Sequence, residues 1–220
     1  MSARKSDIRL PEYLDYDVLD KRTTPSWDEP TRAVIDDRMR TPDEPAWCNL
    51  VQWATLRALC ETIIPQPKDR EQVLLAALVD RKIARGKSDG YRNAQLPPLQ
   101  DAWRIALAAL DEESHSRRRV RFADLDDAAR IELIVAMERG LLHDPAWQKM
   151  SPKLFFSQHV LHDICTAYYA HPYTWSDIGF GGPANPRGYV RMDFNRRDPW
   201  EAVEAKPNQS RPRKRTRHAR

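Results

Sequence analysis

The sequence predicts an all-α protein of about five packed helices, and three observations lead to that prediction. Apolar residues recur at spacings of three and four over most of the stretch from residue 47 to residue 170. No segment shows the sustained alternation of apolar and polar residues that is typical of a half-buried strand. Prolines and glycines, which interrupt helices, fall between the periodic segments. We expect the helices in a domain of residues 46–202, between an irregular arm (1–45) and a basic disordered tail (203–220).

The first two helices are expected at residues 47–64 and 70–85. In the first, apolar residues cover two faces, which indicates a helix at the centre of the core. Asp69, with Gln72 three residues further on, resembles a capping box that opens the second helix. Gly86 follows the basic end of this second helix, at the position where a glycine commonly terminates a helix.

Three more helices are expected further along. A pair of prolines opens the third, and its stripe has spacings of four, three and four: Leu99, Trp103, Ala106 and Leu110. A polar, basic loop over residues 114–121 leads to the fourth helix, at about 126–140. The core side of this fourth helix includes Ile131, Ile134, Val135 and Met137. The last helix spans 152–170, with Ser151 as its N-cap, and His171-Pro172 ends it.

The N-terminal arm combines frequent prolines with many charged residues. Its prolines are Pro11, Pro25, Pro30, Pro42 and Pro45. Because prolines at that density interrupt helices, we expect irregular structure. Six of its residues are too apolar for a simple spacer: Tyr13, Leu14, Tyr16, Val18, Leu19 and Trp27. We therefore expect the arm to lie across a surface, either its own or that of a partner.

The positive charge is concentrated in the last fifteen residues. The chain has 36 basic and 32 acidic residues, a formal net charge of +4. Seven of the basic residues and no acidic one lie in that tail: Lys206, Arg211, Arg213, Lys214, Arg215, Arg217 and Arg220. Such a run is expected to stay disordered. We favour a solvated terminus, and the alternative is a segment that binds phosphates, a membrane surface or an acidic partner.

Two histidines share one face of the last expected helix. His159 and His162 lie on the same side, and Asp163, four residues after His159, is placed to hold the ring of that histidine. An enzyme or a metal centre would use the two histidines as a base or as ligands. Because no third ligand is identifiable, we favour histidines that are satisfied by neighbouring groups in helix packing. Cys165 lies on another face and is expected in the core.

A glycine-rich segment follows the last helix. Four of the seven glycines lie within ten residues, in the stretch WSDIGFGGPANPRGYVRMD (175–193). Aromatic and arginine side chains interleave along a chain that prolines stiffen, which is the composition of a protein–protein contact. The predicted partner-binding residues are Trp175, Gly179, Phe180, Gly181, Gly182, Pro183, Arg187, Gly188, Tyr189 and Arg191. The alternative is a loop that wraps its own helices, but a long irregular stretch, 171–201, is uncommon in a compact protein and favours binding.

Several enzyme classes are disfavoured by missing motifs. The glycines lack the third glycine of dinucleotide-binding spacing and run into Pro183 instead of a helix N-terminus. No GxxxxGK[ST], GxSxG, HExxH or CxxCH motif occurs. The three cysteines form no CxxC pair, which argues against a zinc knuckle or a disulfide framework. We expect no independent catalysis, no metal and no cofactor bound by this chain.

A set of short motifs resembles the small subunit of gluconate 2-dehydrogenase, subunit 3. The motifs are FF (155–156), AHP (170–172), WSDIGFGGP (175–183), PRGY (186–189) and DPWE (198–201). The helical stretches LCETIIP (59–65) and FADL (122–125) are compatible with the same family. The resemblance covers about residues 47–202.

The resemblance implies a noncatalytic accessory subunit of an oxidoreductase complex. In that family the large subunit is an FAD-binding flavoprotein of the glucose-methanol-choline class, which oxidises a sugar, a sugar acid or a glycoside. It often passes electrons to a cytochrome c subunit. The small subunit supports assembly, stability or export of the large one, and the resemblance carries over no catalytic residue. Two alternatives remain: a nucleic-acid-binding module that uses the basic tail, and a small enzyme centred on His159 and His162.

The N-terminal sequence bears on the expected location. No apolar stretch follows the basic residues of MSARKSDIRLPEYLDYD, and no apolar run approaches the ~20 residues of a membrane span. Many small subunits of the family carry a twin-arginine export signal, whereas this N-terminus has neither an Arg-Arg pair nor an apolar segment. We expect a cytoplasmic protein without a membrane span, or a periplasmic one if it is exported with its partner.

Overall fold

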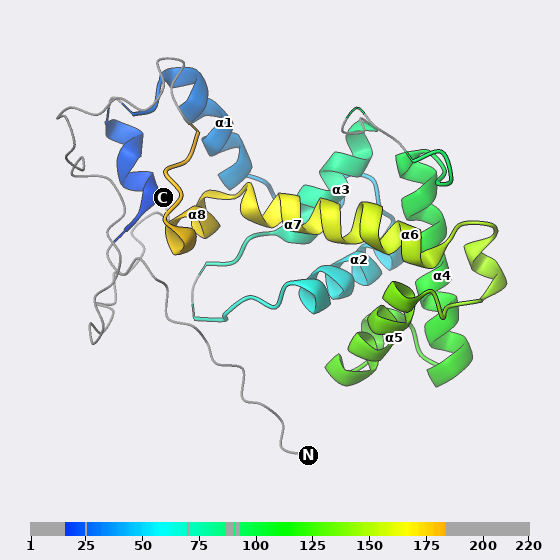
Figure 1. Ribbon diagram of the computed structural model, residues 1–220. Coiled ribbons are helices and arrows are strands. Elements are labelled where there is room, and N and C mark those ends of the chain that lie inside the picture. Colours follow the sequence, from blue (N-terminus) through cyan, green and yellow to red (C-terminus); the bar gives the residue numbers. More distant parts are fainter. Residues whose placement is uncertain (1–15, 25, 70, 87–89, 91–92, 184–220) are drawn as a thin grey trace. The chain divides into compact units, whose positions relative to one another are not determined.

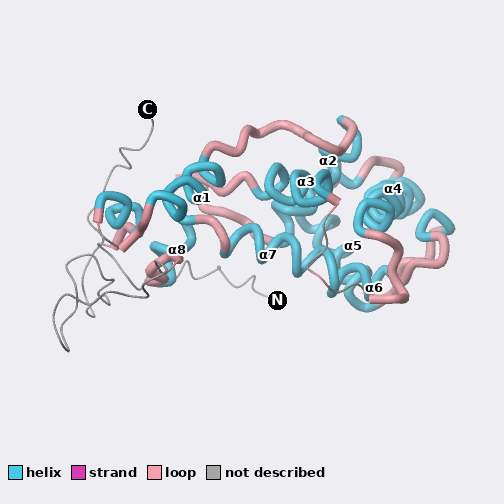
Figure 2. The backbone as a smooth tube through the Cα atoms, turned by 90° about the horizontal axis from the view of Figure 1, so that it is seen from above, coloured by secondary structure: helices cyan, strands magenta, loops and turns pink. Residues whose placement is uncertain are grey.

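The computed structural model describes residues 16–24, 26–69, 71–86, 90 and 93–183. Within these residues the chain forms helices joined by loops, eight of the helices are α-helices, and no strand occurs among them (Figures 1 and 2). The prediction of an all-α fold is therefore confirmed. The chain divides into two compact units, which are treated separately below. Unit 1 combines the described parts of Met1–Arg40 and Tyr169–Arg220, and unit 2 is Thr41–Tyr168.

Unit 2 contains the five helical segments that the sequence predicts. The first four are α2 (Leu50–Ile63), α3 (Leu75–Arg85), α4 (Leu99–Arg118) and α5 (Asp127–Arg139). The fifth is a succession of α6 (Pro152–Phe155), the π-helical turn η4 (Phe156–Val160) and α7 (Leu161–Tyr169), whose last residue is counted in unit 1. Two short 3₁₀-helices, η2 (Phe122–Asp124) and η3 (Pro145–Trp147), lie between them. Helix α2 packs against α3, α4 and α5, which confirms its expected central position.

The core of unit 2 is built around α4. The predicted stripe of this helix is buried, and Trp103 is fully enclosed. The ring of Trp103 lies edge-on against Phe155 of α6, with 5.1 Å between the ring centroids. Its indole Nε1 donates to the Asp163 carboxylate of α7 at 3.0 Å. One side chain of α4 therefore holds the last helical segment by an apolar and a polar contact.

Several helix ends in unit 2 follow the sequence signals. Asn49 and Gln52 form a capping box at the start of α2. The Ser151 hydroxyl accepts from the amide of Leu154 at the start of α6, as predicted. Gly86 ends α3 in the left-handed conformation, with φ at 62°, which confirms its expected role.

The predicted capping box of Asp69 and Gln72 is wrong. Helix α3 begins only at Leu75, and no side chain caps it. The Gln66 side chain accepts from the amide of Val73 at 2.8 Å and donates to the carbonyl of the same residue at 2.9 Å. This pair of hydrogen bonds closes a loop before α3, so the helix starts later than its local sequence suggests.

The predicted basic loop over residues 114–121 is helical in its first half. Helix α4 continues to Arg118, and the Arg117 guanidinium pairs with the carboxylate of Glu113 at 3.2 Å. The Ser114 hydroxyl donates to the carbonyl of Val120 at 2.7 Å, which draws the chain back toward the helix where it ends. Charged pairs at spacings of four stabilise a helix that its low apolar content alone would not predict.

The core side of α5 differs from the prediction at Ile131 and at Val135, which is only half-buried. Ile134 and Met137 are buried as expected, but Ile131 is 53% exposed. Leu133 and Ala136 are buried in its place. Apolar residues occur on nearly every side of this helix, so the sequence pattern does not fix its orientation.

The described residues of unit 1 form three short helices, which come from two distant parts of the chain. They are η1 (Val18–Thr23), α1 (Glu29–Met39) and α8 (Pro172–Ile178). The prediction of an irregular arm is wrong over residues 18–23 and 29–39. Pro30 lies in the first turn of α1, where proline is compatible with a helix, and the Asp28 carboxylate accepts from the amide of Thr31 to cap it.

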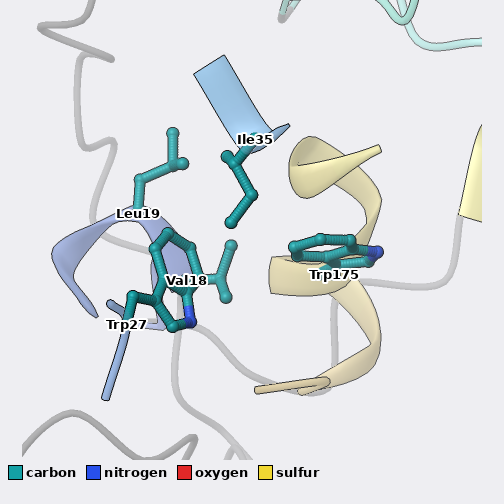
Figure 3. Packing of buried hydrophobic residues seen from close by; sticks show 5 residues of the cluster. All are labelled: Val18, Leu19, Trp27, Ile35 and Trp175. Atoms are coloured by element: carbon teal, nitrogen blue, oxygen red, sulfur yellow. The ribbon is translucent and has the colours of Figure 1, made fainter. Parts of the chain in front are cut away.

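The core of unit 1 is a cluster of five buried residues. Their side chains point toward one another from η1, the following turn, α1 and α8 (Figure 3): Val18, Leu19, Trp27, Ile35 and Trp175. Tyr16, Met39 and Tyr173 pack against the cluster and are partly buried. The prediction of an irregular stretch over 171–201 is wrong for 172–178, because these residues form α8, which places Trp175 in this core.

Candidate partner-binding site

The predicted partner-binding residues occupy different positions around α8. Trp175 is 2% exposed, so its side chain supports the surface from within. Gly179 ends α8 in the left-handed conformation, with φ at 66°. Gly181 and Pro183 are half-buried. The remaining predicted residues, Arg187, Gly188, Tyr189 and Arg191, lie outside the described residues.

Gly182 occupies a place where any side chain would be strained. Its φ is 74°, a region that side chains with a Cβ rarely adopt. A Cβ at this position would lie 2.9 Å from Cζ2 of Trp27 and 3.2 Å from Cζ3 of Trp175. The glycine therefore lets the backbone pass closely over two indole rings, and this part of the segment wraps its own helices, as the alternative interpretation expected.

Among the described members of the predicted set, Phe180 presents a large apolar surface. Its side chain is 43% exposed, and Ile178 beside it is 50% exposed. The Phe180 ring stands perpendicular to Trp175, with 5.5 Å between the ring centroids. Its amide donates to the carbonyl of Trp175 at 2.9 Å. We call residues 178–182, which carry this ring, the Phe180 turn.

Contacts from the N-terminal segment hold the Phe180 turn and the helix before it. The hydroxyl of Tyr16 donates to the Phe180 carbonyl at 3.3 Å, and the ammonium of Lys21 donates to the Gly181 carbonyl at 3.1 Å. The amide of Val18 donates to the hydroxyl of Ser176 on α8 at 3.1 Å. Hydrogen bonds therefore fix the chain before and after the exposed Phe180 ring. Such preorganisation reduces the conformational entropy that is lost on binding.

Sequence reasoning missed Tyr16 and Lys21 as parts of this site. Tyr16 was singled out for its apolar character, and Lys21 carried no signal. Lys21 is only 3% exposed, which is unusual for a lysine. Lys21 stands between Asp20 and Arg22, so no local pattern in the sequence identifies its partner, a carbonyl some 160 positions away.

His171 lies at the N-terminus of α8, in a buried position. Its Nδ1 accepts from the amide of Tyr173 at 3.4 Å, and the residue is 5% exposed. The Arg38 guanidinium of α1 donates to the Ala170 carbonyl at 2.8 Å, next to this histidine. Burial, with a contribution from the positive charge of Arg38, lowers the pKa of His171 from 6.5 to about 4.

In unit 2 the two histidines of the alternative enzyme or metal site, His159 and His162, differ in their exposure to solvent. His162 is exposed, whereas the His159 side chain is 16% exposed and lies against Phe155. The Nδ1 of His159 lies 3.7 Å from the Asp163 carboxylate, which also accepts from Lys82 at 3.0 Å. Burial raises the pKa of this carboxyl, but its hydrogen bonds and the nearby ammonium outweigh that effect and lower the pKa overall. Among the described residues, no three His, Cys, Asp or Glu side chains group closely enough to hold a metal ion.

The three thiols of the described residues are unpaired by disulfides. Burial raises the pKa of Cys60, and burial together with the nearby Asp80 raises that of Cys48. Both therefore stay protonated at neutral pH. Cys165, which was expected in the core, is only partly buried.

The fold and the site define a helical protein that presents a firmly held aromatic side chain at its surface. None of the described helices combines the length and apolar character of a membrane-spanning helix. Residues 51–182, more than half of the chain, match the family of gluconate 2-dehydrogenase subunit 3, and the chain belongs to that family. Comparison with curated proteins and with solved structures gave no match. Membership confirms the resemblance and is consistent with an accessory subunit of a dehydrogenase complex.

Proposed function

We propose that this chain is a noncatalytic accessory subunit of an FAD-dependent dehydrogenase of the glucose-methanol-choline class. The partner would bind the flavin and oxidise a sugar, a sugar acid or a glycoside, passing electrons onward to a cytochrome c subunit. This chain would support the assembly or stability of the flavoprotein. Family membership supports a role in a dehydrogenase complex.

The observation that carries the proposal is the exposed ring of Phe180 on a bonded turn. A large aromatic side chain that is 43% exposed and backed by a buried tryptophan has the properties of an interface anchor. Its neighbour Ile178 extends the apolar surface. In this proposal the flavoprotein buries Phe180 in an apolar pocket, and the glycines of the turn serve the geometry of the anchor instead of contacting the partner.

The first test is affinity purification of the full chain from its native host at moderate salt. We expect a larger protein in a stoichiometric amount and a flavin absorption spectrum, with haem bands if a cytochrome c subunit is present. A colourless protein that emerges without a partner would contradict the proposal. Co-purified nucleic acid that is lost when residues 206–220 are deleted would instead support binding through the basic tail, which lies outside the described residues.

A Phe180→Ala variant tests the anchor itself. Truncation of an interface anchor commonly costs about 2 kcal/mol, so partner affinity should fall by roughly 30-fold. The matched control is Ile131→Ala, which removes an apolar side chain of similar exposure from α5 in unit 2 and should leave affinity unchanged. Circular dichroism verifies that both variants fold. Equal recovery of the partner with both variants would remove Phe180 from the interface.

A further inference from the structure

The cap of α8 depends on a neutral imidazole. The His171 Nδ1 accepts a hydrogen bond from the amide of Tyr173, so this nitrogen carries no proton in the folded chain. The ring also lies against the Tyr173 ring, with 4.6 Å between the centroids, and little of the residue reaches solvent. In a protonated ring, Nδ1 would carry a hydrogen directed at the Tyr173 amide, so it could no longer accept the hydrogen bond from that amide.

The charge around this imidazole is positive. From α1, the guanidinium of Arg38 is fixed beside the ring by its bond to the Ala170 carbonyl. On α8 itself the titratable side chains are Tyr173 and, near the other end of the helix, Asp177. From η1, which also packs on α8, the Lys21 ammonium is directed at the Gly181 carbonyl.

Two carboxylates of η1 and α1 have other partners, and Asp20 and Asp37 of the same helices are exposed. Asp17, which caps η1, accepts from the amide of Leu19, and Asp36 of α1 pairs with Arg22. Protonation of His171 would therefore add a second cation beside Arg38 in a buried place. The new charge would also oppose the positive end of the helix.

We propose that His171 makes unit 1 sensitive to acid, so that its protonation releases α8 and withdraws the Phe180 turn from the partner. The direct structural link is short: α8 begins immediately after His171 and ends at the glycine that precedes Phe180. Among the described residues after 170, Trp175, midway along α8, is the one that belongs to the buried cluster of five. Loss of the cap therefore acts on the helix that carries both Trp175 of the cluster and, at its C-terminal end, the Phe180 turn. The link to a partner rests on the proposed function, whereas the acid sensitivity does not.

The direction of the pH effect follows from the two protonation equilibria. The folded chain holds His171 neutral, with the pKa lowered to about 4, while an open unit 1 would titrate near the ordinary value of 6.5. The stabilisation from this group is complete above pH 6.5 and is lost as the pH falls from 6.5 toward 4. Between pH 7 and pH 5, the equilibrium constant for opening should rise about 20-fold.

Hydrogen exchange on the full chain measures this opening without any partner. After correction for intrinsic exchange rates, peptides of 16–40 and 172–180 should lose about 20-fold of their protection between pH 7 and pH 5. A His171→Asn variant keeps a side-chain acceptor at the cap and cannot titrate, so its protection should be independent of pH in this range. The control is His143→Asn, an exposed histidine of unit 2, which should retain the wild-type pH dependence.

Two further results separate the parts of the proposal. An NMR titration of the His171 ring protons should show a folded-state pKa well below 6.5, and an ordinary value would overturn the proposal. Partner recovery on affinity purification should fall between pH 7 and pH 5 for the wild type but not for His171→Asn. If exchange shows the acid opening but no partner is recovered at either pH, the proposed function fails and the acid sensitivity stands. If both chains release the partner equally, His171 does not control docking.

Discussion

Unit 2 and unit 1 are both helical, but they gain their stability in different ways. Unit 2 is continuous in sequence and buries large side chains from every one of its helical segments. Unit 1 joins two ends of the chain, and its core cluster has five residues, two of which are tryptophans. In a small core each side chain provides a larger share of the buried apolar area. Unit 1 should therefore respond to single changes that unit 2 would tolerate.

The largest expected effect comes from a pair of tryptophan variants. Trp103→Ala should lower the free energy of unfolding of unit 2 by about 4 kcal/mol, because it leaves a cavity and removes a donor to the buried Asp163. Trp175→Ala should cost unit 1 a similar amount, and the smaller core should then open completely. Hydrogen exchange resolved by peptide measures both.

One outcome of that experiment would contradict the greater sensitivity of unit 1 to single substitutions. If Trp175→Ala leaves residues 16–40 as protected as in the wild type, unit 1 does not depend on its cluster. With Trp103→Ala, unit 2 should keep more of its protection from hydrogen exchange, because more side chains share its core.

A smaller effect is expected from Gly182→Ala. The new Cβ would press on Trp27 and would require an unfavourable positive φ, so we expect unit 1 to lose about 2 kcal/mol. The matched control is Gly90→Ala, where φ is also positive, at 85°, but no atom lies within 4 Å of the added Cβ. That variant should lose about 1 kcal/mol in unit 2, so the difference between the two measures the contact with Trp27. Equal losses in denaturant titrations would mean that the indole rings move aside.

The smallest expected effect is a gain in the stability of unit 2. Gln148 has φ 55° and ψ −118°, a conformation suited to glycine, and it lies in a tight turn closed by the Met150 amide, which donates to the Trp147 carbonyl. Gln148→Gly should therefore stabilise unit 2 by about 1 kcal/mol, whereas Gln148→Ala should not. Thermal melting of the two variants checks this, and a lower melting temperature for the glycine variant would show that the Gln148 side chain stabilises the turn.

The helices of unit 2 could largely be predicted because their signals are local. Trp103 and Leu110 follow a period that a single helix imposes, and Ser151 caps the helix that follows it. The late start of α3 could not be predicted, because it depends on a loop that Gln66 closes through Val73. Local patterns identify helices, but contacts across a loop decide where they begin.

The candidate site was predictable only in part. Phe180 stands out among glycines, and its exposure fits the predicted role in binding. Trp175 was expected at the same surface but lies in the core, because its environment is set by Val18 and Ile35 from the other end of the chain. The bond from Lys21 to Gly181 is of the same long-range kind, and no spacing in the sequence encodes it.

The match to the family begins at residue 51, whereas four of the five residues in the core cluster of unit 1 precede it. A boundary drawn by similarity therefore cuts through a folding unit. A version of the chain trimmed to 51–182 would keep Trp175 and expose its indole to water. The buried contact would become an exposed apolar surface that favours aggregation. For this chain, the segment that lies outside the family match is the segment that makes Trp175, which lies inside the match, an interior residue.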